Sequence, residues 1–498
     1  MINLSSFIAF HARRTPDRCA LKYRGENVSY ADFDLRIRQV GSWLVSCGIA
    51  PGDVVAVLMK NSTSFLELVF ATSHIGAVFL PINYRLSADE VGYIVGNSGA
   101  RLLVADEEFA AIVTGGAPVV LLGEVAQSSV TNLAPDIAPA PIHVRQPRDL
   151  MRLMYTSGTT DRPKGVMLSH GNLLAMSLCY LADVDQATPN DASLYAAPIS
   201  HGAGLYNFPH VRMGGRHVVP ETGGFDPDEV LNLGRQLDNV VMFAAPTMVR
   251  RLVDAARKRG ENGEGLRTII YGGGPMYTVD IRDAMATMGP RFVQIYGQGE
   301  SPMTITALSR DWHRASDHPR YLERLASVGT AQSVVTVRIT DKDGTPLPAG
   351  ETGEIEVKGL TVMLGYWNNP EKTEEAFEDG WFRTGDIARR DEAGYVMIVD
   401  RLKDVIIRGG MNVYPREVEE VLYEHPDVVE AAVVGVPDER LGDPGRFDYI
   451  ITVGGLIDGG GGLSPEQNAF LQKAAAAKVG LGSEQALRHL FQKRLGIT

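Results

Sequence analysis

The sequence predicts an α/β fold built around a parallel sheet, followed by a smaller β subdomain and a final α+β domain. Short apolar runs alternate with stretches in which apolar residues recur at helical spacing, a pattern typical of a parallel sheet covered by helices. After residues 351–354 the chain becomes rich in turns and strand-like segments. At 498 residues the chain exceeds the size at which single cores stop growing, so we expect two or more domains.

The first expected elements show this alternation. A capping box at Ser29 opens an amphipathic helix with apolar residues at helical spacing as far as Leu44. The apolar run 54–59 is typical of a buried strand, residues 65–75 return to helical spacing, and residues 102–104 begin another strand. The order strand, helix, strand supports a parallel sheet.

Two further strands run into glycine-containing loops. Residues 269–271 lead into the glycines at 272–274, and residues 292–296 lead into Gly297. Because parallel sheets bind ligands where their strands end, we expect both loops at a binding site. Residues 114–147 have weak periodicity and much Pro, Ala and Gly, and they are interpreted as a surface connection.

The final domain is expected to begin near Asp400. A short strand pattern, an amphipathic helix that opens on Pro415 and a second strand pattern follow one another there. We therefore place an N-terminal domain at residues 1–399 and a C-terminal domain at residues 400–498, with an atypical sequence from about residue 443.

Composition and charge argue against several classes of function. With 48 basic and 60 acidic residues the net charge is −12, which argues against a nucleic-acid partner. No basic amphipathic helix suits a membrane surface and no run approaches about 18 apolar residues, so stable membrane insertion is not expected. The cysteines Cys19, Cys47 and Cys179 are odd in number and lack metal-ligand spacing. We expect reduced, buried thiols and a cytoplasmic location.

The segment from Tyr155 to Gly165 combines the features of a phosphate-binding loop. It reads Tyr-Thr-Ser-Gly-Thr-Thr-Asp-Arg-Pro-Lys-Gly and follows an apolar stretch. Hydroxyl side chains, freely turning glycines and the cation of Lys164 can surround an anion with donors. The spacing excludes a Walker A loop, which requires Gly-x-x-x-x-Gly-Lys-Ser/Thr. For the whole segment, phosphate binding is favoured over a solvent-exposed Ser/Thr/Gly turn.

This segment resembles the signature loop of the AMP-forming adenylating enzymes, the superfamily of acyl-CoA synthetases, luciferases and peptide-synthetase adenylation domains. Further segments resemble other motifs of that superfamily in the same order: 198–204, 272–275, 296–300, 353–367, 381–386 and 400–415. The resemblance extends from about residue 8 to about residue 442 and is closest in type to fatty-acid or aryl acyl-CoA ligases. It implies a large domain of packed α/β sheets with a β subdomain, and a small mobile α+β C-terminal domain.

The resemblance also implies an activity, that of an ATP-dependent acyl-CoA synthetase. Such an enzyme converts a carboxylic acid and ATP to acyl-AMP and pyrophosphate, and then transfers the acyl group to coenzyme A with release of AMP. The implied cofactors are ATP/AMP, Mg²⁺ and coenzyme A, and the implied substrate is a small carboxylic acid, medium-chain or aromatic. Three alternatives remain: an enzyme that loads a carrier protein, a nucleotide-binding homologue with impaired catalysis, and a luciferase-like oxygenase. A homodimer is compatible with the sequence.

Family roles carry over to the residues that match the motifs. The resemblance implies catalytic roles for Thr156, Lys164, His201 and Glu300, and it implies that Glu300 is also the magnesium ligand. Contacts with the nucleotide or with coenzyme A are implied for Ser157, Gly158, Thr159, Thr160, Gly272, Gly273, Gly274, Tyr296, Gly297, Gln298, Asp386, Arg401, Lys403, Gly409 and Gly410.

Some of these implied roles are specific. Tyr296 would stack on adenine, and Asp386 would accept hydrogen bonds from both ribose hydroxyls, since a carboxylate has two acceptor oxygens. Arg401 would bind ribose and phosphate. Lys403 would be the hinge about which the C-terminal domain rotates. The glycines at 409–410 would line a pantetheine tunnel.

The acyl pocket is expected beside His201. In the resemblance this residue is a gate that shapes the pocket and admits coenzyme A, and a general base is not required because the carboxylate is already ionised. Residues 201–206, 243–246 and 298–303, with the glycines at 272–274, are expected to line the pocket.

Two features depart from the family pattern. Gly299 stands where the family usually has threonine, so one donor to the α-phosphate is absent and extra space is expected beside the acyl pocket. From about residue 443 no lysine stands in the Gly-Lys context of the family lysine that bridges the acyl carboxylate and the α-phosphate. Lys493 has the nearest position only by its distance along the chain, and we assign it no role.

Overall fold

The computed structural model describes residues 3–123, 129–133, 136–156, 162–408, 411–423, 430–437 and 447–454. The chain divides into two compact units. Unit 1 comprises Met1–Pro275, Ala284–Val337 and Val357–Phe382, and unit 2 comprises Met276–Asp283, Arg338–Glu356 and Arg383–Thr498. The domain boundary between residues 399 and 400 stays a prediction, because compact units need not coincide with moving domains.

A six-stranded sheet forms the N-terminal part of unit 1, in the order β6-β5-β3-β4-β7-β8. Its strands are β3 (Val54–Leu58), β4 (Val78–Pro81), β5 (Leu102–Asp106), β6 (Val119–Leu122), β7 (Leu150–Thr156) and β8 (Lys164–Ser169). All neighbours pair in parallel except β7 and β8. All five residues of β3 are buried, as expected for a strand covered on both faces.

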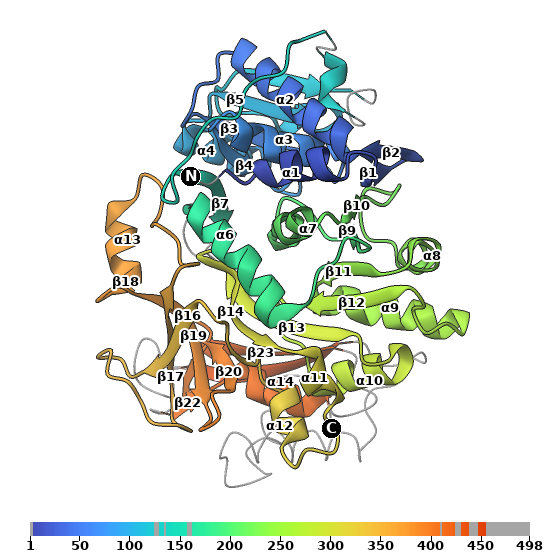
Figure 1. The fold of residues 1–498 in the computed structure, drawn as a ribbon. Helices are drawn as coiled ribbons and strands as arrows, with labels where there is room; N and C mark the ends of the chain where they lie inside the picture. Colours follow the sequence, from blue (N-terminus) through green and yellow to red (C-terminus); the bar gives the residue numbers. More distant parts are fainter. Residues whose placement is uncertain are drawn as a thin grey trace. The chain divides into compact units, whose positions relative to one another are not determined.

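The helices of this part begin at residues suited to helix N-termini. They are α1 (Ser6–Arg14), α2 (Tyr30–Ser46), α3 (Thr63–His74), α4 (Ala88–Ser98) and the short η1 (Glu107–Ile112) and η2 (Val130–Leu133). The Ser29 side chain accepts a hydrogen bond from the Asp32 amide at the start of α2, which confirms the helix start predicted there. Figure 1 shows α2, α3 and α4 around this sheet.

The interpretation of residues 114–147 as a mere connection is wrong in part. Within that range β6 pairs in parallel with β5, and η2 follows it. The residues of β6 alternate between exposed and more buried positions, with Val119 42% exposed and Leu121 43% exposed. A four-residue edge strand with so little burial has too weak an apolar pattern to be recognised from the sequence.

A mixed nine-stranded sheet forms the rest of the unit 1 scaffold, in the order β15-β14-β13-β12-β11-β9-β10-β1-β2. Its strands are β1 (Cys19–Tyr23), β2 (Glu26–Ser29), β9 (Ala192–Leu194), β10 (Arg216–Val218), β11 (Val240–Ala244), β12 (Leu266–Tyr271), β13 (Phe292–Gln298), β14 (Ser301–Leu308) and β15 (Thr330–Ala331). The central strands pair in parallel, and the antiparallel pairs lie at the two edges. The predicted parallel arrangement is therefore confirmed for the centre of this sheet.

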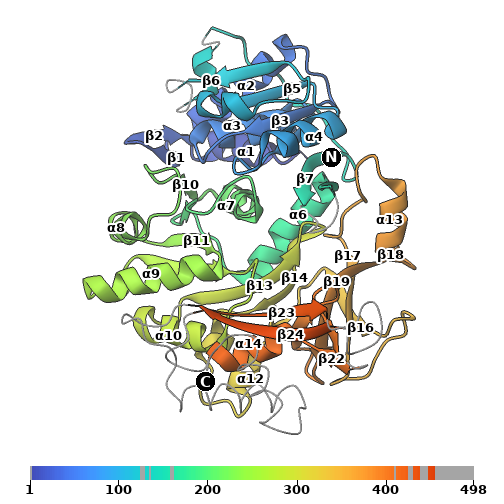
Figure 2. The ribbon, with the colours of Figure 1, turned by 180° about the vertical axis from the view of Figure 1, so that it is seen from behind.

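The helices that belong to the middle of the chain are α6 (His170–Cys179), η3 (Tyr180–Val184), η4 (Gly202–Tyr206), α7 (Asn207–Met213), α8 (Pro227–Leu237), α9 (Pro246–Arg259), α10 (Thr278–Met288), α11 (Arg310–Arg314) and α12 (Tyr321–Leu325). Figure 2 shows α8 and α9 beside β11, and both helices contact that strand. Both helices also begin with proline in the first turn, where a missing amide hydrogen has little consequence.

A turn-rich β region follows, as the sequence predicted. Its five-stranded sheet has the order β16-β17-β19-β18, with β20 paired to β19. The elements are β16 (Val335–Thr340), β17 (Thr352–Gly359), α13 (Pro370–Ala376), β18 (Phe377–Glu378), β19 (Trp381–Arg390) and β20 (Val396–Arg401). The division between the two units passes through these residues.

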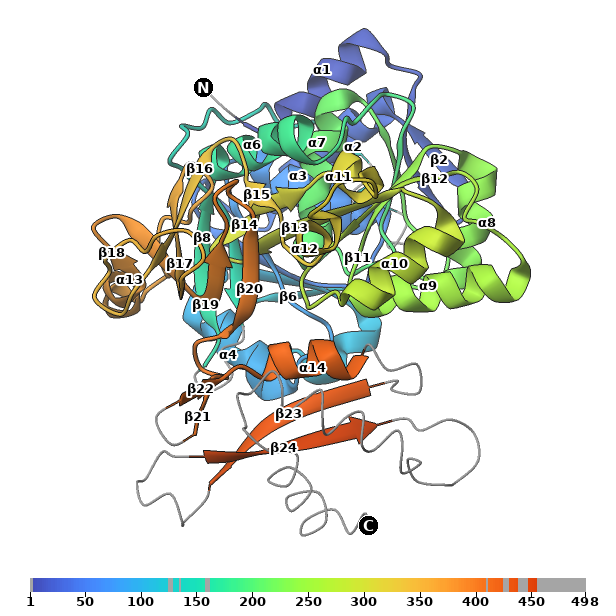
Figure 3. The same ribbon diagram turned by 90° about the horizontal axis from the view of Figure 1, so that it is seen from below.

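Among the residues that the structure describes after β20, unit 2 contains one helix and two small antiparallel sheets (Figure 3). Its elements are β21 (Ile406–Arg408), β22 (Met411–Val413), α14 (Pro415–Tyr423), β23 (Glu430–Pro437) and β24 (Phe447–Gly454). The helix start at Pro415 is as predicted. The predicted atypical tail lies outside the described residues from residue 455 onward.

The cysteines correct one expectation. All three are free, but Cys19 is half-buried, Cys47 is exposed and Cys179 is buried. The prediction of buried thiols is therefore wrong for Cys47, which directly follows α2 at its C-terminal end. In the described part of the chain, no helix is both long and apolar enough to cross a membrane.

Candidate active site

The predicted phosphate loop connects β7 to β8. Thr156, the last residue of β7, lies opposite Lys164, the first residue of β8, in the antiparallel pair. The ends of the predicted loop are thus held side by side by strand pairing. Ser157, Gly158, Thr159 and Thr160 lie outside the described residues, so their roles stay predictions.

A segment about 200 residues later in the chain lies against β8. Trp367 donates its amide hydrogen to the carbonyl oxygen of Gly165 at 2.7 Å, and the Met167 amide donates to the Gly365 carbonyl at 3.0 Å. A Cβ on Gly165 would lie 3.0 Å from Tyr155 Cζ and 3.2 Å from Trp367 Cβ. Glycine therefore permits the close approach of this segment to the β7–β8 hairpin.

Tyr366 in that segment connects two predicted catalytic residues. The ammonium nitrogen of Lys164 lies 4.6 Å from the centroid of the Tyr366 ring. The Tyr366 hydroxyl donates to Glu300 Oε1 at 2.8 Å. Burial, followed by the nearby Glu300 carboxylate, raises the pKa of Tyr366. The phenol therefore stays protonated and holds one oxygen of Glu300.

Sequence reasoning missed Tyr366. Its segment resembles one of the family motifs, but the sequence indicates no role for this residue. The contact joins residues 66 positions apart, and the hydroxyl of a tyrosine in a turn-rich stretch carries no local signal of its partner.

Glu300 itself has limited access to solvent. Its exposed fraction is 8%, and its backbone oxygen accepts a hydrogen bond from the Met363 amide at 2.7 Å. Among the described residues, no group of three or more His, Cys, Asp or Glu side chains could hold a metal ion. A magnesium ion at Glu300 would therefore take its other oxygens from water and from a bound phosphate substrate, an arrangement usual for Mg²⁺.

The space beside Gly299 is filled, so the expectation of extra space there is wrong. A Cβ on Gly299 would lie 2.6 Å from Thr156 Cγ2 and 3.7 Å from Val166 Cγ2. The methyl group of Thr156 thus occupies the position next to Gly299. Glycine at this place allows the end of β7 to approach the loop that carries Glu300.

The two predicted glycine loops lie together. β12 and β13 are parallel neighbours, and a Cβ on Gly272 would lie 2.5 Å from the carbonyl oxygen of Ile295. Gly273 has a φ of +78°, in the region that favours glycine. Gly274 is exposed, which leaves this loop open at the surface. The two strand ends therefore lie at one edge of the sheet, and a ligand-binding role for their loops stays a prediction.

The end of β13 carries three more predicted residues. Tyr296 is only 9% exposed, while Gly297 and Gln298 are half-buried. A Cβ on Gly297 would lie 2.6 Å from the amide nitrogen of Met303, so the tight turn into β14 requires glycine. Adenine stacking on Tyr296 stays a prediction.

His201 lies in a loop that a buried cation holds. Arg152 is fully buried and donates from one guanidinium nitrogen to the Ser200 carbonyl at 3.2 Å. The Ser200 hydroxyl lies 3.0 Å from His201 Nδ1. The pKa of His201 is lowered, because surrounding protein desolvates the ring and Arg152 adds positive charge nearby. His201 is therefore neutral near pH 7.

Asn61 is a second support of the His201 loop. Its side-chain oxygen accepts from the Ile199 amide at 2.8 Å, and its side-chain nitrogen donates to the Ala197 carbonyl at 2.9 Å. Sequence reasoning missed both Asn61 and Arg152. The sequence carries a weak signal for both residues: Arg152 interrupts an apolar strand pattern, and Asn61 closely follows another.

Asp386 and Arg401 lie opposite each other on β19 and β20 within unit 2. Arg401 Nε lies 3.4 Å from Asp386 Oδ1, with 59% of the Arg401 side chain exposed and only 6% of the Asp386 side chain exposed. Lys403 is exposed in the turn that follows. Gly409 and Gly410 lie outside the described residues. Asp386, Arg401 and Lys403 belong to unit 2, and their contacts with ribose and phosphate stay predictions.

Comparison with known proteins decides the family. The family model described as "AMP-binding enzyme" matches residues 8–367, and the model described as "AMP-binding enzyme C-terminal domain" matches residues 417–446. This chain belongs to the AMP-binding enzyme family. The C-terminal match ends close to residue 443, where the sequence was predicted to become atypical.

Relatives of this AMP-binding enzyme act on several acids. A feruloyl-CoA synthase from an Amycolatopsis species is 37% identical, covering 92% of this chain and 90% of the relative. A fatty acid–[acyl-carrier-protein] ligase from Streptomyces coeruleorubidus is 34% identical, covering 87% of this chain and 84% of the relative. MatB from Rhodopseudomonas palustris, in its crystal structure with bound ATP, is 34% identical in sequence to this chain. The two structures align with a TM-score of 0.83 over 96% of this chain and 92% of that chain.

These comparisons confirm the predicted family, the α/β fold class and the class of enzyme, an AMP-forming acid–thiol ligase.

Proposed function

We propose that this chain is an ATP-dependent acyl-CoA synthetase. In the first step an oxygen of a carboxylic acid bonds to the α-phosphorus of ATP, and the bond to pyrophosphate breaks, which gives acyl-AMP. In the second step the sulfur of coenzyme A bonds to the acyl carbon, and AMP leaves. The arrangement of Lys164, Tyr366 and Glu300 carries the proposal, because it supports a cation and a carboxylate beside one phosphate-binding loop.

The first step requires charge neutralisation more than covalent chemistry. Thr156 and Lys164, with the loop residues Ser157, Gly158, Thr159 and Thr160, are assigned to the β- and γ-phosphates. Glu300 is assigned as the protein ligand of Mg²⁺, held in place by the Tyr366 hydroxyl. Bound Mg²⁺ would neutralise phosphate charge. The buried position of Glu300 favours this role over that of a surface charge.

The remaining nucleotide contacts follow the strand ends. Tyr296, Gly297 and Gln298 at the end of β13, with the glycines at 272–274, are assigned to adenine and to the acyl group. Asp386 and Arg401 are assigned to the ribose and the phosphate, which suits an acceptor beside a cation.

The second step requires access for a thiol. Neutral His201 is assigned as the gate between the acyl pocket and coenzyme A, and burial lowers its pKa. Lys403 is assigned as the hinge of a C-terminal domain that begins at residue 400, and Gly409 and Gly410 as the lining of the thiol channel.

The acceptor has one specific alternative. A relative with 34% identity is a fatty acid–[acyl-carrier-protein] ligase, so a separate carrier protein is the second candidate for the acceptor. The relative with 37% identity is a CoA ligase, which favours coenzyme A. The proposed acid is a small aromatic or medium-chain carboxylic acid, and the proposed setting is a cytoplasmic enzyme that acts as a monomer or a homodimer.

The test is the acid-dependent exchange of labelled pyrophosphate into ATP over a panel of short, medium-chain, branched and aromatic acids. Coenzyme A or an acyl carrier protein is then added to the active mixtures. We expect exchange with at least one acid and thioester formation with coenzyme A. Transfer to the carrier alone would establish the second candidate, and no exchange despite AMP binding would overturn catalysis by this chain.

Glu300→Gln tests the metal role. The amide keeps the size of the side chain but removes the negative charge, so exchange should fall by about 100-fold or more. Glu67→Gln, at another buried carboxylate of unit 1, serves as the matched control and should keep near-normal exchange at pH 7. Equal exchange rates in wild type and Glu300→Gln would remove Glu300 from the metal site.

A further inference from the structure

A small cavity lies between the nine-stranded sheet and the segment formed by η4 and α7. Its lining combines apolar residues with four polar ones, Ser193, Tyr195, Tyr206 and His210. The cavity admits about one water-sized group, which is enough for a single polar substituent but too little for a ring.

The cavity adjoins the region expected to hold the acyl group. Ala203 lines the cavity and lies two residues after His201. Phe243 also lines the cavity, and its Cζ lies 3.8 Å from the point where a Cβ on Gly273 would stand. The Phe243 ring lies 6.2 Å from the ring of Tyr206. An aromatic wall therefore extends from the predicted nucleotide loop to the cavity.

Two polar atoms of the lining have no partner in the part of the chain that the structure describes. They are the hydroxyl oxygen of Tyr206 and Nδ1 of His210, both buried. The other ring nitrogen of His210, Nε2, lies 3.2 Å from the Tyr180 hydroxyl. A buried polar atom without a partner is unfavourable, so these two atoms favour a hydrogen-bonding group between or beside them.

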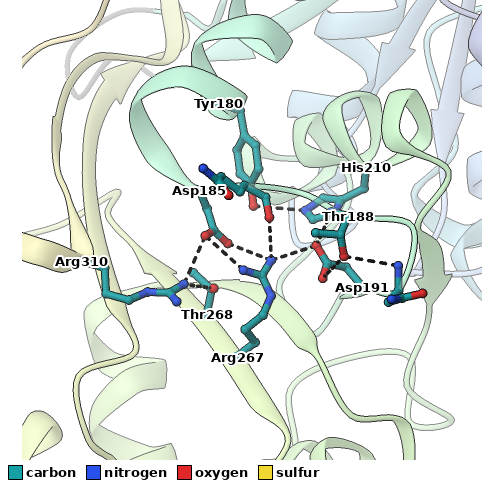
Figure 4. Close-up of polar contacts among 10 residues, drawn as sticks. Tyr180, Asp185, Thr188, Asp191, His210, Arg267, Thr268 and Arg310 are labelled. Atoms are coloured by element: carbon teal, nitrogen blue, oxygen red, sulfur yellow. Dashed lines mark hydrogen bonds and ion pairs between the residues drawn. The ribbon is translucent and has the colours of Figure 1, made fainter.

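The charged side chains near His210 are two arginines paired with two aspartates (Figure 4). Arg267 lies 2.8 Å from Asp191 and 3.0 Å from Asp185, and Arg310 lies 3.2 Å from Asp185. Two cations therefore face two carboxylates. The cluster supplies no net charge to a ligand.

The two unpartnered groups are themselves neutral. Burial, followed by the positive charge of Arg267, lowers the pKa of His210 to about 3. Burial raises the pKa of Tyr206 well above its ordinary value. A ligand carboxylate or ammonium would enter without a counter-charge, which is unfavourable in a buried site. A neutral hydroxyl or carbonyl can satisfy both atoms.

We propose that this cavity is the far end of the acyl pocket and selects aryl carboxylic acids that carry a ring hydroxyl. The inference rests on the proposed acyl-adenylating function. The aromatic ring of the acid would lie along Phe243, and its hydroxyl would enter the cavity and hydrogen-bond with Tyr206 and His210. Tyr206 and His210 are thus specificity-determining residues.

The experiment compares 3-phenylpropenoic acid with its 3-hydroxy and 4-hydroxy ring derivatives. Pyrophosphate exchange gives kcat/KM for each acid, and the rise in Tm with each acid, with and without AMP, reports binding without catalysis. For wild type we expect the better hydroxylated acid to exceed the unsubstituted acid by about 10- to 100-fold in kcat/KM. In Tyr206→Phe the ratio should fall to about one.

Tyr30→Phe is the matched control. Tyr30 is also fully buried, and its hydroxyl donates to the Gly215 carbonyl at 2.6 Å, outside the cavity. This variant should keep the wild-type ratio, even if its stability falls.

Each outcome bears on the proposal. A wild-type ratio near one in both assays, or an unchanged ratio in Tyr206→Phe, would overturn it and leave a buried water as the occupant. The wild-type ratio decides this even if Tyr206→Phe fails to fold. A hydroxyl-dependent rise in Tm without exchange would support the pocket and contradict the proposed function, whereas exchange without hydroxyl preference would do the reverse.

Discussion

Glu67 is a fully buried carboxylate in unit 1. Its side chain has no exposed surface, and it accepts hydrogen bonds from the Ser129 hydroxyl at 3.0 Å and the Val130 amide at 2.9 Å. Arg36 lies 3.5 Å away. Removal of a carboxylate from water is costly even with such partners. Burial accordingly raises the pKa of Glu67 to about 7.

This shift predicts a pH-dependent stability. The pKa is about 7 in the folded protein against an ordinary value of 4.5, so the folded state binds the proton more tightly. The resulting stabilisation is fully present below about pH 4.5 and is lost as the pH rises through about 7, by about 3 kcal/mol in all. Glu67→Gln lacks this titration.

The measurement is denaturant unfolding of wild type and Glu67→Gln at about pH 5 and about pH 8. We expect the wild type to gain stability relative to the variant at the lower pH. Parallel changes in the two proteins between these pH values would contradict the pKa shift of Glu67.

At the scale of elements, two glycines of one segment differ in how much space a side chain would have. The loop 198–204 carries His201 and contains both Gly202 and Gly204. A Cβ on Gly204 would lie 1.9 Å from the carbonyl oxygen of Ile199, an atom of the rigid backbone. A Cβ on Gly202 would meet the sulfur of Met303 at 3.0 Å, and methionine side chains adapt easily.

The two positions therefore predict different results for the same substitution. Gly204→Ala should displace the His201 loop, with a loss of about 1–3 kcal/mol in stability and a larger fall in acyl-adenylate formation. Gly202→Ala should cost much less in both. Thermal unfolding and pyrophosphate exchange check this pair, and equal effects of the two variants would show that the loop can move around Gly204.

At the scale of the whole molecule, a chain with a net charge of −12 is proposed to bind a polyanionic nucleotide. Local cations must then outweigh the overall charge, and Lys164 and Arg401 are the proposed ones. Electrostatic attraction at this range depends on nearby charges more than on the total, because salt screens exposed charges beyond about 8–10 Å.

The nucleotide site predicts stabilisation of the intact chain. At a concentration of about 100 times Kd, AMP should stabilise the folded protein by about 2.7 kcal/mol, which thermal unfolding detects as a rise in Tm. GMP should give a smaller rise, and Asp386→Asn should reduce the effect of AMP by removing the proposed ribose acceptor. A Tm that does not respond to AMP or ATP would contradict the assignment of these residues to a nucleotide.

The sequence by itself determined what depends on local pattern: a buried strand in the apolar run 54–59, the helix starts at Ser29 and Pro415, the parallel pairing of strands in an α/β fold and the family. These features are readable because periodicity, caps and motifs lie within a few residues of one another. The apolar pattern of β6 is too weak to predict that strand in the same way.

Tertiary structure alone decided which distant side chains meet. It brought the Tyr366 hydroxyl to Glu300, placed the Thr156 methyl group beside Gly299 and left Tyr206 and His210 facing a cavity without partners. Each of these facts depends on packing between segments far apart in the chain. Such packing depends on the shapes and volumes of all the residues involved, so no local pattern in the sequence contains it.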